Sequence, residues 1–305
     1  MSLVICICTY NRNQSLLECL KSIKKLRIKK NLKIKIIIID NSLKKNSYTM
    51  INRIKKKFKF KIFYISEKKR GIVYARNKCL NELKKIKPKY AAFIDDDCTV
   101  DKFWITNALK IFSIKNAEVV TGPQIYKKKI TSNKIVKNNF AEFFEKKINN
   151  SISKVKWAAS NNVFFKYDII NNQNVSFDKN LNKFGIGEDQ LFFSLLNKKG
   201  FKIYWSKKVK VYEKTHKHRS NVEWLMERSY RLGILGHYID IKLNGKFLGY
   251  LINYLKSLYY FINAIYKLLF IFDKNLKINF LNSFFRSYGR LIGPFRIKKI
   301  QFYKK

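Results

Sequence analysis

The sequence predicts an α/β fold, with a mostly parallel sheet flanked by helices and a helical C-terminal extension. Short, continuous apolar runs alternate with segments of helical periodicity over the first hundred residues. Strands buried on both faces have such continuous runs, and their alternation with helices favours a parallel sheet. From about residue 220 onward the apolar positions follow a helical period instead.

Four predicted strands supply the parallel part of this sheet. They take in residues 2–8, 34–39, 60–65 and 90–94. Three predicted helices connect them: one capped by Asn13 or Ser15 and apolar from Leu16 to Leu26, a polar one at 46–57, and one that opens at Gly71 and continues to Ile86. Crossovers through these helices place the strands side by side in one sheet.

Polar residues follow each of these strands. They are Thr9 to Arg12, Asp40 to Ser42, Arg70, and Asp95 to Asp97. In open parallel sheets, ligands bind beyond the carboxyl ends of the strands. Because four strand ends carry polar groups toward one edge, the sequence predicts a ligand site there.

The adjacent carboxylates of Asp95, Asp96 and Asp97 are unusual in a chain of 305 residues with a formal net charge of +45. Such carboxylates repel one another unless they share a cation. Judged locally, the three acids fit either a metal site or a solvated turn that caps the next helix. Asp101 could fill the capping role on its own.

The middle of the chain has shorter and less regular elements. The pattern predicts a helix from Asp101 through Phe112, a strand at 118–121, a loop at 124–155 with one short helix near 139–148, and a strand or hairpin from Trp157 to Phe165. Gly185 and Gly187 then form a flexible turn into a helix that begins near Glu188 and Asp189 and ends at Gly200. Short strands at 202–205 and 209–212 follow.

The C-terminal part is helical, basic and aromatic. A helix at 221–240 precedes a largely apolar stretch at 247–272 that contains Lys256 and Lys267. These lysines disfavour a membrane span and favour either an amphipathic helix at the membrane interface or a helix packed on the domain. We expect one domain at 1–235 and an extension at 236–305, whose tail fits an anionic membrane surface or a solvated end.

Charge and cysteine usage narrow the partners and the compartment. Lysine is spread over the whole length, so nucleic acid is not the expected partner, and the surplus should favour anionic lipid, nucleotide diphosphates or acidic glycans. The five cysteines form no CxxC pair, which favours small core residues in a reducing cytoplasm. The N-terminus lacks the pattern of a secretory signal. We therefore expect a cytoplasmic protein, with peripheral contact at the inner face of the cell membrane as a further hypothesis.

Five short motifs resemble, in order and spacing, those of the family 2 glycosyltransferases. They are CTYNR (8–12), DNS (40–42), RGIVYARN (70–77), DDD (95–97) and GIGED (185–189). A later segment, Val211 to Glu213 with Arg219, Trp224, Arg228, Arg231 and Gly233, is similar to a basic helix of many members. The resemblance covers roughly residues 2–235 and implies a catalytic domain of the GT-A type, with a Rossmann-like sheet, at 1–235.

The resemblance implies direct transfer, with inversion, of a sugar from a nucleotide-diphosphate sugar to a hydroxyl group of a glycan or lipid-linked acceptor. Synthesis of bacterial surface polysaccharide or lipopolysaccharide is the implied setting. Asp97 is implied to bind Mn²⁺ or Mg²⁺, with Asp95 or Asp96 turned toward the ribose or donor sugar and Asp95 as a second candidate ligand. Asp189 is implied as the general base with support from Glu188, although two acids here also fit the first turn of a helix.

The remaining predicted donor contacts are Thr9, Asn11, Arg12, Asp40, Arg70, Gly71 and Arg76. Asp40 is implied to bind the base or ribose, and its local alternative is an Asx-turn. Arg70, Arg76 and the backbone N–H groups that follow Gly71 are expected near the phosphates.

Four further positions keep two interpretations each. Arg228 and Arg231 either close over the diphosphate or form a solvated helix face, and Trp157 either stacks on a sugar or belongs to the core. Many family members have His where this chain has Glu213. The metal site is therefore predicted to be completed by Glu213 or by a nearby histidine, His216 or His218.

Two rival functions fit part of the pattern. A nucleotidyltransferase would also hold a metal and a nucleotide on an α/β sheet, but CTYNR lacks the glycines that grip a triphosphate. A non-enzymatic protein that binds nucleic acid or a membrane surface would explain the charge but neither the triple Asp nor the Gly-Glu-Asp motif.

Overall fold

A computed structural model describes residues 1–28, 31–127, 130–131, 134–135, 140, 142, 148–173, 175–214, 219–269 and 274–296. The chain forms two compact units. The sheet unit comprises Met1–Lys127, Glu145–Asn182 and Glu188–Lys214, and the helical unit comprises Lys128–Phe144, Lys183–Gly187 and Thr215–Lys305.

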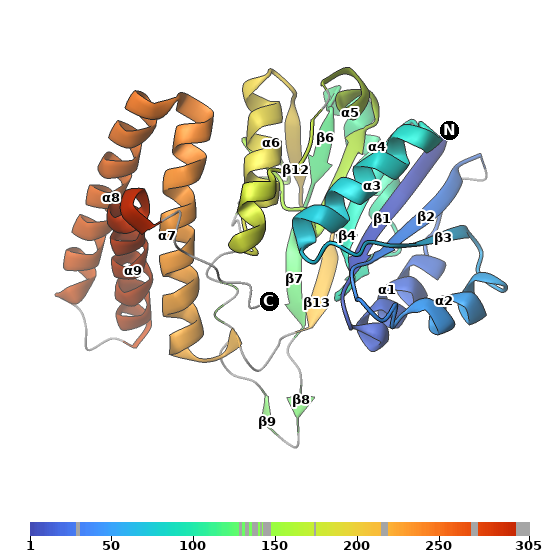
Figure 1. Cartoon of the computed structure of the whole chain (residues 1–305), viewed down its shortest axis with the longest axis horizontal. Coiled ribbons are helices and arrows are strands. Elements are labelled where there is room, and N and C mark those ends of the chain that lie inside the picture. The colour runs from blue at the N-terminus through green and yellow to red at the C-terminus, as the bar shows by residue number, and fades with distance from the viewer. Residues whose placement is uncertain are drawn as a thin grey trace. The chain divides into compact units, whose positions relative to one another are not determined.

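The sheet unit is built on eight strands in the order β10-β12-β6-β11-β4-β1-β2-β3 (Figure 1). Their bounds are β1 Ser2–Thr9, β2 Lys33–Asp40, β3 Lys61–Ser66, β4 Tyr90–Asp95, β6 Val119–Thr121, β10 Ile152–Val155, β11 Asn162–Lys166 and β12 Ile203–Ser206. Strands β4, β1, β2 and β3 are mutually parallel, as are β6 and β12. β11 runs antiparallel between β4 and β6, and β10 runs antiparallel to β12. The predicted α/β fold with a mostly parallel sheet is confirmed.

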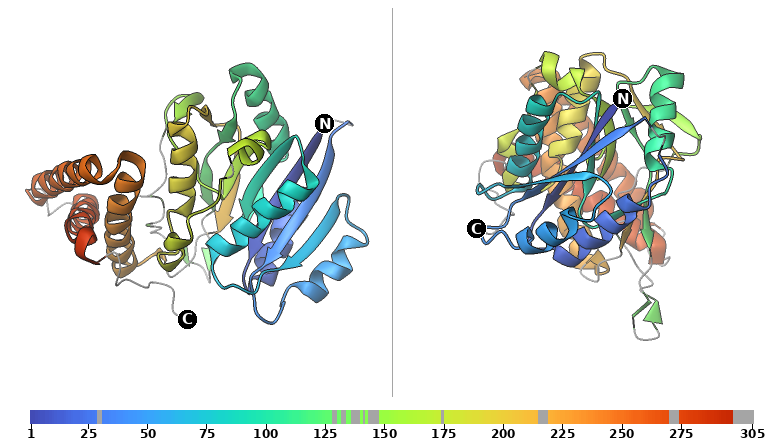
Figure 2. Two further views of the ribbon diagram at one scale, coloured as in Figure 1. Left: turned by 45° about the horizontal axis from the view of Figure 1, so that its top comes forward. Right: turned by 90° about the vertical axis from the view of Figure 1, so that its right-hand side faces the viewer.

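Helices cover both faces of this sheet because its strands are apolar on both sides (Figures 1 and 2). Along β1, Leu3, Ile5 and Ile7 enter one buried cluster, whereas the alternate residues Val4, Cys6 and Cys8 enter the other. The first cluster includes side chains of α1 Asn13–Lys24, α2 Tyr48–Lys55 and α4 Trp104–Lys115. The second includes side chains of α3 Ile72–Ile86, α5 Asp168–Gln173 and α6 Glu188–Lys198.

A smaller sheet lies beside the end of β4. Its strands, in the order β5-β13-β7, are β5 Cys98–Val100, β13 Val211–Lys214 and β7 Gln124–Lys127. β5 begins one residue after the triple Asp, where the sequence predicted the approach to a helix. The capping role suggested for Asp101 is wrong in detail: Phe103 holds the N-cap position of α4, and the Asp101 carboxylate accepts a hydrogen bond from the Phe103 N–H at 2.8 Å.

Two further predictions differ from the structure. The loop predicted at 124–155 contains strands β7 and β10 at its ends, while the short helix predicted near 139–148 falls largely outside the described residues. The strand predicted from Trp157 begins only at Asn162. The chain also forms the 3-10 helix η2 Lys179–Lys183, and the short strands β8 Ile130–Thr131 and β9 Lys134–Ile135 pair in the helical unit.

Three long helices make up most of the helical unit: α7 Val222–Asn244, α8 Lys246–Leu268 and α9 Lys274–Arg296 (Figure 1, orange to red). α8 and α9 lie in the part of the chain for which the sequence predicts a helical, basic and aromatic extension, and the helical prediction is confirmed. The three helices pack on one another. α7 and α9 come close together at Gly233 and Gly289, so a Cβ on either glycine would overlap the backbone of the other helix. Among the described helices, none combines the length and hydropathy that a membrane crossing requires.

Candidate active site

The ends of three parallel strands lie level with one another at one edge of the large sheet. Thr9, the last residue of β1, is opposite Asp40, the last residue of β2. Asp95 ends β4 opposite Cys8 of β1. The polar groups that the sequence placed after these strands therefore share one edge of the sheet unit.

Asp40 is fully buried and organises the loop that follows β2. Its Oδ1 accepts a hydrogen bond from the Ser42 N–H at 2.9 Å. Its Oδ2 accepts from the Ser47 N–H at 3.1 Å and from the Tyr64 hydroxyl at 2.7 Å. This is the Asx-type alternative suggested for Asp40, extended by two more donors. The predicted contact between Asp40 and a nucleotide stays a prediction.

Asn41 links the loop after β2 to the loop before α3. Its amide nitrogen donates to the carbonyls of Glu67 and Lys69 at 2.9 and 2.7 Å, and its Oδ1 accepts from the Gly71 N–H at 2.7 Å. Gly71 has φ 131°, and a Cβ there would overlap the side chain of Asn182. Only glycine satisfies both the backbone angle and the space at this position.

Two residues of the CTYNR motif, Thr9 and Arg12, form hydrogen bonds with the triple Asp. The Thr9 hydroxyl donates to Asp96 Oδ2 at 2.7 Å, and the Arg12 guanidinium donates to Asp96 at 3.3 Å and to Asp97 at 2.9 Å. Burial, reinforced by the charge of Asp97 and opposed by Arg12, raises the pKa of Asp96 to about 7. Asp96 and Asp97 are therefore neighbouring like charges that share the Arg12 guanidinium.

Arg76 is buried and joins two acidic motifs that are far apart in the sequence. One of its guanidinium nitrogens donates to Glu188 and the other to Asp95, at 3.3 Å for the latter. Burial opposes the charge on Arg76, but its two carboxylate partners raise its pKa above the ordinary value. A guanidinium is suited to this bridge because its nitrogens diverge in one plane.

Glu188 has one oxygen that no described residue satisfies. Its side chain is almost fully buried, Oε1 accepts from Arg76, and Oε2 finds no hydrogen-bond partner among the residues that the structure describes. Burial raises the pKa of Glu188 to about 7, against the attraction of Arg76 and with the repulsion of Asp189. Buried polar atoms are nearly always satisfied, so a free Oε2 indicates a position for a ligand or an ordered water.

Asp189, in the first turn of α6, is oriented by the loop before β11. Its Oδ2 accepts hydrogen bonds from the Ser160 N–H at 3.0 Å and from the Ser160 hydroxyl at 3.2 Å, and its Oδ1 accepts from the Gln190 N–H at 2.7 Å. The carboxylate is only partly buried. It is thus fixed in position while solvent still has access to it.

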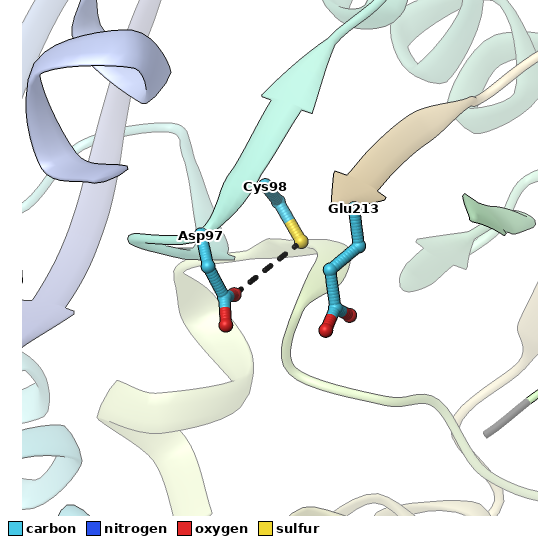
Figure 3. A group of neighbouring side chains, drawn as sticks. All are labelled: Asp97, Cys98 and Glu213. Carbon is cyan, nitrogen blue, oxygen red and sulfur yellow. Dashed lines mark hydrogen bonds between the residues drawn. The ribbon is translucent and has the colours of Figure 1, made fainter. Parts of the chain in front are cut away.

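A cluster of possible metal ligands lies where the triple Asp approaches strand β13, which carries Glu213. Asp97, Cys98 and Glu213 each offer one ligand atom, and these atoms all lie within 4.8 Å of one another. Figure 3 shows the three side chains directed into the same space, Asp97 and Cys98 from the start of β5 and Glu213 from β13. Cys98 and Glu213 are brought together because they are register partners in the antiparallel pair β5–β13. Burial raises the pKa of the Cys98 thiol, and both carboxylates raise it further.

The predicted metal ligands do not all belong to one group of side chains in the structure. Asp97 and Glu213 belong to this cluster, whereas the Asp95 carboxylate is engaged by Arg76. Gln124, on the neighbouring strand β7, donates a hydrogen bond to Glu213 and so holds it in place. His216 and His218, the alternatives to Glu213, lie outside the described residues.

The other predicted contacts occupy varied environments. The Arg70 guanidinium lies 5.4 Å from the ring centroid of Tyr10, and Asn11, at φ 55°, accepts a hydrogen bond from Asn46. Trp157 packs, partly buried, against the second core cluster. In the helical unit, Arg228 lies 5.6 Å from the ring centroid of Trp224, and Arg231 donates to the Phe184 carbonyl.

Comparison with known proteins identifies the family. The model of the family described as "Glycosyl transferase family 2" matches residues 4–171, which is more than half of the chain. The chain belongs to glycosyl transferase family 2. It is thus a sugar-transferring enzyme, as the motifs predicted, and the nucleotidyltransferase and non-enzymatic alternatives do not hold.

Individual proteins are also similar to this family 2 transferase. It is 26% identical over 227 residues to the succinoglycan biosynthesis protein ExoM of Rhizobium meliloti (strain 1021). The aligned residues cover 74% of this chain and 71% of the relative. The structure of S. aureus TarS 1–349 aligns with a TM-score of 0.56 over 80% of this chain and 66% of that one, about two thirds of its length, at 15% identity.

Two ligand complexes have the same fold. TarS 1–349 in complex with UDP-GlcNAc aligns with a TM-score of 0.53 over 100% of the transferase and 93% of that chain, at 14% identity. The mannosyltransferase PcManGT from Pyrobaculum calidifontis, in complex with GDP-Man and Mn²⁺, aligns with a TM-score of 0.61 over 96% of the transferase and 87% of that chain, at 12% identity. At such identities these structures establish the shared GT-A fold alone.

Sequence reasoning missed three residues that contact the acids of the transferase. They are Ser160, which holds Asp189; Gln124, which holds Glu213; and Cys98, which adjoins Asp97. The sequence contained a signal only for the segment of Ser160, where Asn161 and Asn162 interrupt an apolar run.

Proposed function

We propose that this family 2 transferase moves a sugar from a nucleotide-diphosphate sugar to an acceptor hydroxyl, with inversion and with the help of Mn²⁺ or Mg²⁺. The observation that carries the proposal is the Arg76 bridge between Asp95 and Glu188. It joins the triple Asp to the Gly-Glu-Asp motif, so that groups suited to binding the donor and a group suited to activating the acceptor belong to one site.

The donor side of the site is rich in groups that suit a nucleotide diphosphate. Arg12 and Arg70 are cationic and partly exposed near the ends of β1 and β3, and α3 begins directly after Gly71, where its N–H groups are available to phosphate. The similar proteins TarS and PcManGT are recorded with UDP-GlcNAc and GDP-Man, which supports a donor of this class.

The residues around Asp97 fit a divalent cation. Asp97 and Glu213 offer carboxylate oxygens, which Mg²⁺ and Mn²⁺ prefer, and Cys98 offers a softer ligand that Mn²⁺ tolerates better than Mg²⁺. A cation there would also reduce the repulsion between Asp96 and Asp97. When bound, it would supply positive charge to the departing diphosphate.

Asp189 is suited to act as the general base. Ser160 fixes one carboxylate oxygen, and the side chain keeps access to solvent, so it can accept the proton of an acceptor hydroxyl as the bond to the sugar forms. Oε2 of Glu188, which has no hydrogen-bond partner among the described residues, provides a partner for a second hydroxyl of the substrate. Direct attack by the acceptor from the side opposite the diphosphate inverts the anomeric carbon.

The acceptor is proposed to be a glycan or lipid-linked sugar in the synthesis of a bacterial surface polysaccharide. The similarity to a succinoglycan biosynthesis protein supports this setting. The peripheral position at the inner face of the cell membrane, expected from the basic extension, is consistent with a lipid-linked acceptor.

Titration calorimetry with UDP-, GDP- and dTDP-sugars in the presence of Mn²⁺ tests the donor and metal assignments. We expect one nucleotide class to bind, and Asp97→Asn to weaken Mn²⁺-dependent binding by about tenfold or more. Asp101→Asn is the matched control, because Asp101 contacts the Phe103 N–H and an amide oxygen can replace that contact. Donor binding that Asp97→Asn leaves unchanged would contradict the metal assignment, and failure of every donor would contradict the function.

Asp189→Asn separates catalysis from binding. We expect donor affinity to stay within about twofold and turnover to fall by roughly 10²–10⁴-fold, the usual contribution of a general base. Asp168→Asn, in the first turn of α5, removes an acid from an equivalent helix position and should leave turnover intact. Equal losses of affinity and turnover in Asp189→Asn would show that Asp189 has a structural role.

A further inference from the structure

Helix α8 of the helical unit has an inverted distribution of polarity. Its buried residues are small or polar and recur on one stripe, namely Gly249, Asn253, Ser257 and Ala264. Large apolar side chains cover its exposed side along the whole length: Phe247, Leu248, Tyr250, Leu251, Tyr254, Leu255, Leu258, Tyr259, Phe261, Ile262, Ile265, Tyr266 and Leu268. A helix on the surface of a water-soluble domain normally buries its apolar stripe and exposes its polar one.

The contacts of α8 with α9 are correspondingly polar. The Asn253 amide donates to the Arg290 carbonyl at 3.1 Å, and the hydroxyls of Ser257 and Ser287 each donate to the other residue's carbonyl, at 2.9 and 2.8 Å. Gly249 lies so close to α7 that a Cβ there would meet the backbone of Ile241. Small residues and interhelical hydrogen bonds are the means by which helices associate when their surroundings are as apolar as their own side chains.

The charge of residues 241–305 indicates which apolar environment the exposed face of α8 contacts. Residues 241–305 contain thirteen Lys and Arg but one acidic residue, Asp273. Asp240, the nearest acid before this segment, is already engaged by Arg290 at 2.7 Å and by Lys256 at 2.6 Å. A second copy of the same basic segment would be repelled, whereas anionic headgroups would be attracted.

We propose that the exposed apolar face of α8 docks this chain in the interface of an anionic lipid bilayer. No described helix is suited to span a membrane, so α8 would lie in the plane of the interface with its apolar face below the headgroups. Tyr250, Tyr254 and Tyr259 suit this depth, because their rings are apolar and their hydroxyls reach water. The proposal rests on the helical unit alone and is independent of the proposed chemistry.

Flotation of the full chain with vesicles tests the docking. The probes are vesicles of phosphatidylcholine alone and vesicles that also contain phosphatidylglycerol. Ile262→Asp removes one apolar side chain from the face, and Ile114→Asp on α4 is the matched control, because the two isoleucines are 57% and 56% exposed. We expect binding to the anionic vesicles, and Ile262→Asp to lower their partition coefficient by about tenfold or more, while Ile114→Asp leaves it unchanged.

Three results would overturn the proposal. They are absence of binding to anionic vesicles, equal loss of binding in both variants, and self-association of the vesicle-free chain that Ile262→Asp abolishes, which would make a second copy the occupant. Light scattering without vesicles detects the last of these. Donor titration on Ile262→Asp provides the distinction from the catalytic proposal, since donor affinity should be unchanged whether or not docking occurs.

Discussion

Glu188 is buried next to the guanidinium of Arg76. Burial raises its pKa from the ordinary 4.5 to about 7. The folded protein therefore holds this proton more tightly than the unfolded chain does. Ionisation of Glu188 then disfavours the folded state, so its contribution to stability must decline as pH rises from about 4.5 to about 7 and be constant above that.

The Glu188→Gln variant tests this sign directly. We expect the free energy of unfolding of the wild type, minus that of Glu188→Gln, to fall by roughly 3 kcal/mol between pH 4.5 and 7.5 and then to level off. Urea denaturation at a series of pH values measures it. A rise of the Glu188 difference with pH would mean that its carboxylate is stabilised by charge rather than destabilised by burial.

At this scale the sequence indicates candidate acids more readily than the groups that hold them. Asp97 and Asp189 belong to short motifs, and a motif is visible without a structure. Ser160 and Gln124 act through contacts with residues distant in the sequence, and serine or glutamine in a loop or short strand has many ordinary roles. Asp40 shows the reverse case, since its local alternative as the organiser of a turn is what the structure displays.

The loop before α3 depends on one backbone conformation. We expect Gly71→Ala to lower the free energy of unfolding by about 3 kcal/mol or more, because Gly71 combines φ 131° with overlap against Asn182. Gly200→Ala is the matched control. Gly200 has φ 93°, but its added Cβ would meet no atom of the described residues within 4 Å, so about 1 kcal/mol is expected from backbone strain alone. Thermal or urea unfolding measures both.

A second substitution separates overlap from strain at Gly71. Asn182→Ala removes the atoms that an alanine at 71 would meet, so the double variant should recover part of the loss. Equal stability of Gly71→Ala and Gly200→Ala would show that the loop yields to the extra methyl group.

The elements that the sequence predicted are those with strong local signals. β1, β2 and β4 are continuous apolar runs and were found within two residues of their ends. β5 and β7 have three and four residues and pair with β13, so their own sequences contain little local signal for a strand. For α8, sequence alone left an interfacial helix and a packed helix open, and the structure shows a packed stripe with an exposed apolar face.

The positive charge of the whole chain predicts weak, non-specific attraction to polyanions. We expect binding to duplex DNA at low salt that falls steeply as salt increases and is lost near physiological ionic strength, because phosphate contacts depend on released counterions. Fluorescence anisotropy with labelled DNA measures it. Donor binding should persist at the same salt. DNA affinity that survives physiological salt would assign the charge a specific partner of this kind.

The topology of the sheet was only partly open to prediction. The parallel β1–β4 portion follows from alternation of strands and helices, which is a property of neighbouring segments. The antiparallel insertion of β11 between β4 and β6 depends on pairing across long stretches of chain, and no local pattern encodes it. That insertion matters for the site, since the loop that enters β11 supplies Ser160.

The Arg76 bridge also constrains how this site can change in evolution. Loss of the guanidinium would leave two acids, one almost fully buried, without their shared cation, at a cost that breaking a buried pair usually makes severe. Loss of Glu188 alone would leave the buried Arg76 with Asp95 as its carboxylate partner among the described residues. Positions 76 and 188 are therefore expected to vary together among relatives.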